Sequence, residues 1–215
     1  MATASQSLFN MTVASDNAGG NQGLLMPKLQ FRFRVNFLNF GASASSIELT
    51  KQVIDCSRPN LSFAEITLPV YNSTMYLAGK HTWAPMNINV RDDASNTVSR
   101  LVGQQLQKQM DFVEQASAAT GQDYKFQTNV EILDGGNGAA APIVLETWEL
   151  YGCFLKSANY NNLNYGTSEA VTIALAIAYD NAIQSPLTSG VGTSVGRALN
   201  GSTGIATGIG TLGQQ

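Results

Sequence analysis

Few side chains in this sequence are of the types that carry out acid–base or metal chemistry. His81 is the only histidine, and no acid or nucleophile lies at a spacing typical of a catalytic site. A histidine at a strand end beside Trp83 is the simpler interpretation. Asp92 and Asp93 could ligate a metal ion, but no further oxygen ligands surround them, and the dipole of a following helix stabilises acids at its start. We therefore expect neither a catalytic histidine nor a metal site.

Three glutamates on the two sides of an expected hairpin are the next candidates. Glu131 faces Glu146 or Glu149 within residues 124–155, and a pair of carboxylates performs the chemistry of most glycosidases. The separation of these groups is not set by the sequence, and no other residues indicate a sugar cleft. A hydrolase with a β fold therefore stays as an alternative.

Two further patterns suggest a cofactor or a covalent bond without supporting one. The glycines of residues 208–213 match G-x-G-x-x-G, but no strand precedes them and the sequence leaves no room for the helix. Cys56 and Cys153 lie in separate strand-like segments. A disulfide between them stays open, and buried free thiols are the simpler interpretation. We expect no cofactor.

The composition indicates a subunit of an assembly more than a free monomer. Charged residues make up 13% of the 215 residues, and the formal net charge is −3. The usual charged share is about 25%, and interface cores are depleted of charge. A low-charge β protein without partners is the alternative. Basic residues are scattered, which argues against a nucleic-acid reader, and we expect no secretory signal and no membrane span.

One amphipathic helix is expected over about residues 95–118, after a strand that ends at Asp92 and Asp93. Ser95 and Asn96 are good helix caps. Apolar residues then recur at spacings of three and four, which is typical of a helix with one buried face. They are Val98, Leu101, Val102, Leu106, Met110 and Val113.

The rest of the folded part has the alternation of strands. Such segments are residues 29–40, 47–56, 63–70, 75–78, 83–91, 124–133, 143–155 and 169–179, with a bend at Gly79. One helix covers only one patch of sheet, so the strands must also cover each other or other copies. This predicts a mainly β fold, an antiparallel barrel or sandwich with a flanking helix.

The chain divides into three parts. Residues 1–28 lack periodicity and are expected to form an extended arm, residues 29–183 the β-barrel domain, and residues 184–215 a Gly/Ser/Thr-rich tail that cannot form a core alone.

The order of motifs in residues 29–183 resembles the tail tube proteins of contractile-tailed bacteriophages. The motifs are the Phe31 to Phe37 strand, Leu68-Pro69 before Tyr71-Asn72, Tyr76-Leu77-Ala78-Gly79-Lys80, Trp83 to Pro85, Asp92-Asp93, Asn96-Thr97-Val98, Trp148-Glu149-Leu150-Tyr151-Gly152, Leu163-Asn164-Tyr165 and Tyr179-Asp180-Asn181. The long arm and the Gly-rich tail depart from the compact family pattern.

The resemblance implies a structural virion protein and no enzyme. Such proteins form homohexameric rings that stack into the inner tube of a contractile tail, inside a sheath, and double-stranded DNA passes through the lumen without specific binding. The implied partners are copies of the chain, the sheath protein, the baseplate and tail-terminator proteins and the tape-measure protein. The implied location is the virion tail, assembled in the bacterial cytoplasm.

Polar faces of the expected 124–155 hairpin are the candidate contacts. We expect lumen or ring contacts at Gln127, Asn129, Glu131, Glu146 and Glu149, and contacts between rings at Asp134, Gly135, Gly136 and Asn137. A mildly negative lumen would repel phosphates and keep DNA from sticking.

Two other functions stay open besides the hydrolase. The same fold builds the inner tubes of DNA-free injection and type VI secretion machines, which the sequence does not separate from a phage tail. A free carbohydrate- or peptide-binding module is disfavoured, because exposed aromatic residues are sparse.

Overall fold

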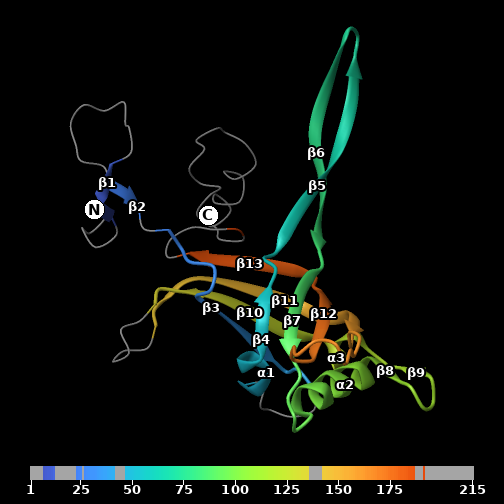
Figure 1. The fold of residues 1–215 in the computed structure, drawn as a ribbon. Coiled ribbons are helices and arrows are strands. Elements are labelled where there is room, and N and C mark those ends of the chain that lie inside the picture. Colours follow the sequence, from blue (N-terminus) through green and yellow to red (C-terminus); the bar gives the residue numbers. More distant parts are fainter. Residues whose placement is uncertain are drawn as a thin grey trace, which may run out of the picture.

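A computed structural model of the chain describes residues 7–12, 23–25, 27–41, 47–135, 142–186 and 191 (Figure 1). The body is a seven-stranded antiparallel sheet in the order β3-β10-β11-β12-β7-β4, and β13 pairs with β11 beside this path. The strands are β3 (Phe33–Leu38), β4 (Val53–Cys56), β7 (Met86–Arg91), β10 (Phe126–Leu133), β11 (Val144–Asn159), β12 (Thr172–Ala178) and β13 (Asn181–Pro186). The expected mainly β, antiparallel architecture is confirmed.

The core is formed by the apolar side chains that alternate with more exposed ones along the strands. Leu175 of β12 lies opposite Ile88 of β7, and both are buried. The residues between, such as Ala174 and its partner Asn89, face the other side and are half-buried. Successive side chains of a strand point to opposite faces, so one face of the sheet carries the apolar set. The core members that share this face on β7 and β12 are Met86, Ile88, Val90, Ile173, Leu175 and Ile177.

Helix α2 (Thr97–Gln109) forms where the apolar stripe predicts it, but it ends earlier than residue 118. Asn96 takes a left-handed conformation and makes no side-chain cap; instead Asp93 Oδ1 accepts the backbone N–H of Val98 at 2.9 Å. Beyond the helix, Asp111 Oδ1 accepts the N–H of Val113 at 2.8 Å. Such local side-chain bonds compete with helical ones. Val113 is therefore exposed, and the chain turns through β8 (Met110–Asp111) and β9 (Ala116–Ser117).

Two short helices were not expected from the sequence. Residues 47–56 do not form one strand: α1 (Ile47–Lys51) buries Leu49 in the core, and β4 begins only at Val53. Its I-x-L pattern fits a helical turn as well as a strand, and packing against α2 selects the helix. The other is α3 (Gly121–Tyr124), which precedes β10 and carries a capping box of Thr120 and Asp123. In Figure 1 α1, α2 and α3 lie at the end of the body away from a projecting hairpin.

That hairpin consists of β5 (Asn60–Val70) and β6 (Ser73–Ala84), which, among the described strands, pair only with each other (Figure 1). The sequence predicts strand 63–70 correctly, and the irregularity expected at Gly79 is a β-bulge within the continuous strand β6, not the end of a short strand at Ala78. The glycine is required by a close approach: a Cβ there would lie 2.9 Å from the carbonyl oxygen of Ala64. The extra residue lies in β6: Phe63 pairs with His81 and Glu65 with Ala78, so Gly79 and Lys80 lie opposite Ala64, and a bulge of this kind bends the strand.

The chain ends are described in part. Within the expected arm, β1 (Ser7–Thr12) and β2 (Gly23–Leu25) form an antiparallel pair. At the other end β13 continues to Pro186, past the residue where the tail was expected to begin. Most of that tail lies outside the described residues. Both cysteines are free thiols; Cys153 is buried as expected, whereas Cys56 is half-buried, and burial raises the pKa of Cys56 to about 12 and that of Cys153 to about 11.

Candidate assembly surfaces

The β5–β6 hairpin carries an apolar face that the described part of the chain leaves uncovered. Ile66 lies opposite Leu77, and Leu68 opposite Met75. Residues directly opposite each other in an antiparallel pair share one face of the ribbon. Together with Val70 these side chains form what we call the apolar hairpin face, and each is 40–54% exposed. The other face carries the opposed pairs Glu65 and Ala78, Thr67 and Tyr76, and Pro69 and Thr74.

An isolated two-stranded hairpin is only marginally stable in water, so an apolar face of this length needs a partner surface. Its base is fixed to the body. The ring of Trp83 contacts that of Tyr179 with centroids 5.6 Å apart, and His81 lies edge-on to Trp83 at 6.3 Å. The expectation of a histidine beside Trp83 is therefore confirmed. Sequence reasoning did find the alternation of residues 63–70, but not that the ribbon would leave the body.

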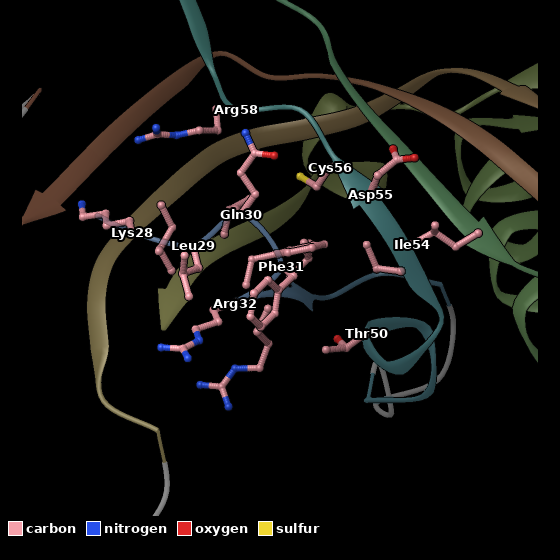
Figure 2. Close-up of a pocket in the computed structure, with 16 residues that line it drawn as sticks. Lys28, Leu29, Gln30, Phe31, Arg32, Thr50, Ile54, Asp55, Cys56 and Arg58 are labelled. Atoms are coloured by element: carbon pink, nitrogen blue, oxygen red, sulfur yellow. The ribbon is translucent and has the colours of Figure 1, made fainter. Parts of the chain in front are cut away.

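A groove of about 740 Å³ lies between the two strands at which the main sheet ends, β3 and β4 (Figure 2). Figure 2 shows the segment from Lys28 to Arg32 on one side, Thr50 and Ile54 to Cys56 on the other, and Arg58 at the upper end of the view. The floor is apolar and the rim mostly basic. Its apolar lining residues include Phe31, Phe33, Val35, Val53, Ile54, Val130 and Ile132, and its basic ones are Lys28, Arg32, Arg34 and Arg58.

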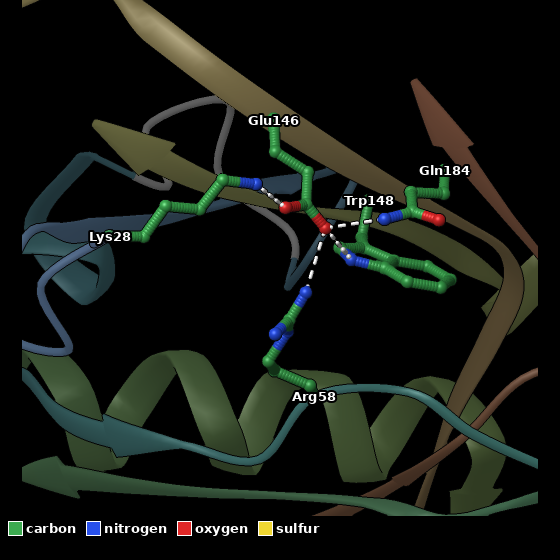
Figure 3. A network of polar contacts seen from close by, with 5 residues as sticks. All are labelled: Lys28, Arg58, Glu146, Trp148 and Gln184. Atoms are coloured by element: carbon green, nitrogen blue, oxygen red, sulfur yellow. Dashed lines mark hydrogen bonds and ion pairs between the residues drawn. The ribbon is translucent and has the colours of Figure 1, made fainter. Parts of the chain in front are cut away.

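A buried carboxylate joins the two sides of this groove (Figure 3). Glu146 of β11 is only 2% exposed. Its Oε1 accepts hydrogen bonds from Arg58 Nη2 at 2.8 Å, Trp148 Nε1 at 2.7 Å and Gln184 Nε2 at 2.7 Å, and Lys28 forms an ion pair with Oε2. Lys28 precedes β3 and Arg58 follows β4, so one acid holds both flanking segments.

The partners of Glu146 determine its charge state. Burial by itself raises the pKa of the carboxyl, but the hydrogen bonds from Lys28, Gln184 and Trp148 and the charge of Arg58 outweigh it and lower the pKa from 4.5 to about 2. Hydrogen bonds and cations near a carboxylate favour its ionised form. Glu146 is therefore an anion at neutral pH and connects Lys28 to Arg58 within the subunit.

The residues expected to contact the lumen or a ring neighbour separate onto two faces of the sheet. Glu131 pairs with Thr147 in register, whereas Ile132 pairs with Glu146, so Glu131 and Glu146 face opposite sides. This excludes the two as a glycosidase pair. Because Glu146 is buried, its carboxylate is no part of the subunit surface.

The other four lie together on the outward face. Asn129 lies opposite Glu149 in register. Gln127 donates to Asn129 Oδ1 at 3.1 Å, and Arg34 Nε donates to Glu131 at 2.7 Å. The Tyr151 hydroxyl donates to Glu149. They form a polar patch around the β10–β11 pair, and its place at the lumen or at a ring contact stays a prediction.

The structure describes only Asp134 and Gly135 of the four residues expected to contact another ring. Asp134 Oδ1 accepts the N–H of Gly135 at 2.8 Å and that of Ile143 at 2.9 Å, which closes the end of the β10–β11 hairpin. Gly136 and Asn137 lie outside the described residues. The contact expected at this tip stays a prediction.

The described residues contain no cluster of three or more His, Cys, Asp or Glu side chains that could hold a metal ion. Asp93 acts at the start of α2, where hydrogen bonds from Ser95 and then from the Val98 N–H lower its pKa to about 2. Within the described part of the chain, none of the helices has both the length and the apolar character needed to cross a membrane.

Comparison with known proteins gives a match at the level of structure. No protein-family model matches the sequence, and no curated protein matches it. A chain of the PVC sheath–tube complex of an extracellular contractile injection system, in the extended state, matches with a TM-score of 0.54 and 13% identity over 75% of this chain and 93% of that one.

Two further matches come from the anti-feeding prophage. A chain of its tube-terminating cap matches with a TM-score of 0.57 and 10% identity over 80% of this chain and 99% of that one. A chain of its six-fold symmetrised baseplate matches with a TM-score of 0.54 and 14% identity over 77% and 100%. The chain therefore has a fold found in chains of contractile injection assemblies.

Proposed function

We propose that this chain is a structural subunit of the inner tube of a contractile tail, where rings of six copies stack around a lumen. The observation that carries the proposal is the apolar hairpin face, which projects from a body of the tube-protein fold and is not covered by any of the described residues. A surface of this kind is typical of a subunit that is completed by its neighbours. The role is structural and not enzymatic.

The partners follow from the same proposal. The body would contact copies in its own ring, the hairpin would reach a copy in the next ring, and the outer surface of the tube would face a sheath. Terminator, baseplate and tape-measure proteins would meet the ends and the lumen of the tube. In the phage form the tube belongs to the virion and conducts double-stranded DNA during ejection.

A DNA-free injection particle is the second candidate, and a specific observation favours it. The similar structures described above come from an extracellular contractile injection system and from the anti-feeding prophage. A capsid gene beside the gene for this chain, or a DNA-filled head on the purified particle, would decide for the phage. A headless particle that contains a sheath would decide for the injection system.

The polar patch of β10 and β11 is the surface we propose for the lumen or for ring contacts. In the phage form, its carboxylates would keep the phosphates of DNA from binding. Glu131 is the residue to reverse, because Glu146 is buried in an internal network. A particle with Glu131→Lys should eject DNA more slowly; ejection at the original rate would contradict the proposal for this residue.

Assembly itself is tested by negative-stain electron microscopy and sedimentation velocity of the purified full chain over a range of concentrations. Rings with six-fold symmetry or long hollow tubes are expected. A folded protein that remains monomeric at the highest concentration would contradict the proposed function.

A further inference from the structure

We propose that the groove between β3 and β4 is the site at which a second copy of this chain docks the apolar face of its β5–β6 hairpin. This inference rests on the proposed function and specifies the contact between stacked copies. The hairpin and the groove are each incomplete in the single chain, and each offers what the other lacks.

None of the described residues covers the exposed apolar side chains of the groove. Phe31, at its rim, is 74% exposed, and Ile54 is 37% exposed. The main sheet ends at β3 and at β4, so both present backbone groups along this opening that no strand of the described sheet bonds. Free edges of this kind accept an added strand or ribbon. The groove therefore suits an extended apolar partner better than a small molecule.

The hairpin has the matching shape. Its strands span Asn60–Val70 and Ser73–Ala84, and at a rise of roughly 3.4 Å per residue β5 reaches about 35 Å. One face of the ribbon is apolar from Ile66 to Val70 and back from Met75 to Leu77. The outer edges of β5 and β6 have no strand partner in the described sheets. The ribbon could thus cover the apolar floor and bond to a free edge at the same time.

The connection between the two elements requires a different copy. β5 follows β4 after a short link that contains Arg58, and Glu146 holds this link in place. In Figure 1 the hairpin then leads away from the body that contains the groove, so it points toward a neighbour. A contact between two different surfaces repeats head to tail and builds an open stack, as a tube requires.

The expected contact area is modest. The apolar hairpin face, from Ile66 to Val70, is about 17 Å long and about 10 Å wide and offers on the order of 170 Å² per partner, which is well under half of what a stable pair of proteins needs. A single docked hairpin is therefore weak. Rings of copies make the contact several times at once, and this multiplicity supplies the missing affinity.

Disulfide trapping between two populations of the full chain tests the proposal. Both carry Cys56→Ala and Cys153→Ala; one adds Ile54→Cys in the groove and the other adds Leu68→Cys on the apolar hairpin face. The matched control replaces Leu68→Cys by Thr67→Cys, because the neighbouring residue lies on the opposite face of the same ribbon. After mixing, assembly and oxidation, a cross-linked dimer is expected with position 68 and not with position 67.

The outcomes separate the contact from the function. Rings or tubes without the 54–68 cross-link, or with equal cross-linking from position 67, would overturn the proposed docking site. The proposed function as a tube subunit would still stand. Monomers only, from the unmodified chain as well, would overturn both. If the chain without cysteines does not fold, a benzophenone amino acid placed at position 68 or 67 of the otherwise natural sequence gives the same comparison. Its products should map to residues 28–35 or 50–58 from position 68 alone.

Discussion

Arg58 Nη2 lies 2.8 Å from Glu146 Oε1, and this contact ties the link between β4 and the projecting hairpin to the middle of the sheet. Lys28, on the other side of the groove, pairs with the second oxygen of the same carboxylate. The carboxylate is buried, while the two basic side chains are about half exposed. One anion thus fixes the width of the groove and the starting direction of the hairpin, and its removal should affect both stability and assembly.

The substitution Glu146→Gln should lower the free energy of unfolding by about 2 kcal/mol at pH 7. The lowered pKa of Glu146 corresponds to a somewhat larger free energy, but Lys28 and Arg58 are partly exposed, so solvent screens part of their interaction with the carboxylate. The folded-state pKa is lowered, so the stabilisation is complete above pH 4.5 and is lost as the pH falls from 4.5 towards 2. Urea unfolding at several pH values measures it. The natural chain should lose stability over this interval, and the variant should lose less.

Glu149→Gln is the matched control for this experiment. Glu149 lies on the same strand but on the outward face, where it accepts a hydrogen bond from Tyr151. Its loss should change the free energy of unfolding by less than about 0.5 kcal/mol. Equal effects of the two changes would show that the buried network contributes no special stability.

Gly152 is a second position with a large expected effect. It lies within β11 at φ +67°, where the register with β10 shifts, and a Cβ there would overlap Asp180 Oδ2. Gly152→Ala should therefore cost about 2 kcal/mol or more, from the left-handed backbone and from the displaced carboxylate. Thermal unfolding of the variant measures the loss.

A second glycine provides the control for that change. Gly103 lies in α2, and a Cβ there meets nothing within 4 Å. Gly103→Ala should stabilise the chain by roughly 0.5–1 kcal/mol, because alanine is the better helix former. If both substitutions destabilise the protein equally, neither the conformation nor the contact of Gly152 is special.

The sequence predicted much of this fold, and the errors have physical causes. Period-two alternation identified most strands of the main sheet, since each has one buried face. The predicted helix is too long because Met110 and Val113 continue the apolar spacing of α2. In the structure Asp111 accepts backbone N–H groups of the following residues, and the helix has ended before it. The helical turn at Ile47–Lys51 was missed because five residues are too few to separate the two periods.

The candidate surfaces were harder to predict than the strands. The alternation of Ile66, Leu68 and Val70 is visible in the sequence, but a buried strand and a projecting one have the same pattern. The burial of Glu146 follows from Lys28, Arg58 and Gln184, which are distant in the sequence and meet only in the fold. Four of the five residues expected as lumen or ring contacts share one face because they alternate along one hairpin, whereas Glu146 lies on the other face.

Gln105 of α2 should be as important to stability as an apolar core residue. It is fully buried; its Oε1 accepts the N–H of Gly41 at 3.0 Å, and its Nε2 donates to the carbonyl oxygen of Tyr124 at 2.7 Å. Gln105→Leu would leave both backbone groups without this partner, at a cost of about 2–3 kcal/mol. The exposed Gln107→Leu on the same helix should have little effect, and chemical unfolding of the two variants compares them.

The apolar hairpin face should determine assembly without determining folding. Leu68 and Met75 lie opposite each other and are 40% and 54% exposed, so the double variant Leu68→Ser, Met75→Ser removes little from the core. We expect circular dichroism and the melting temperature of the body to stay close to those of the natural chain. Stacking should be lost, because the ribbon no longer has an apolar surface to bury in a neighbour.

The control is the double variant Thr67→Ser, Tyr76→Ser, which changes the adjacent opposed pair on the other face of the hairpin. It should stack like the natural chain. Sedimentation velocity and negative-stain electron microscopy measure the distribution of monomers, rings and tubes. Tubes of normal length from the folded Leu68→Ser, Met75→Ser variant would exclude the apolar face as the contact between stacked copies. Equal loss of stacking in both variants would mean that the hairpin matters as a whole and that the face does not.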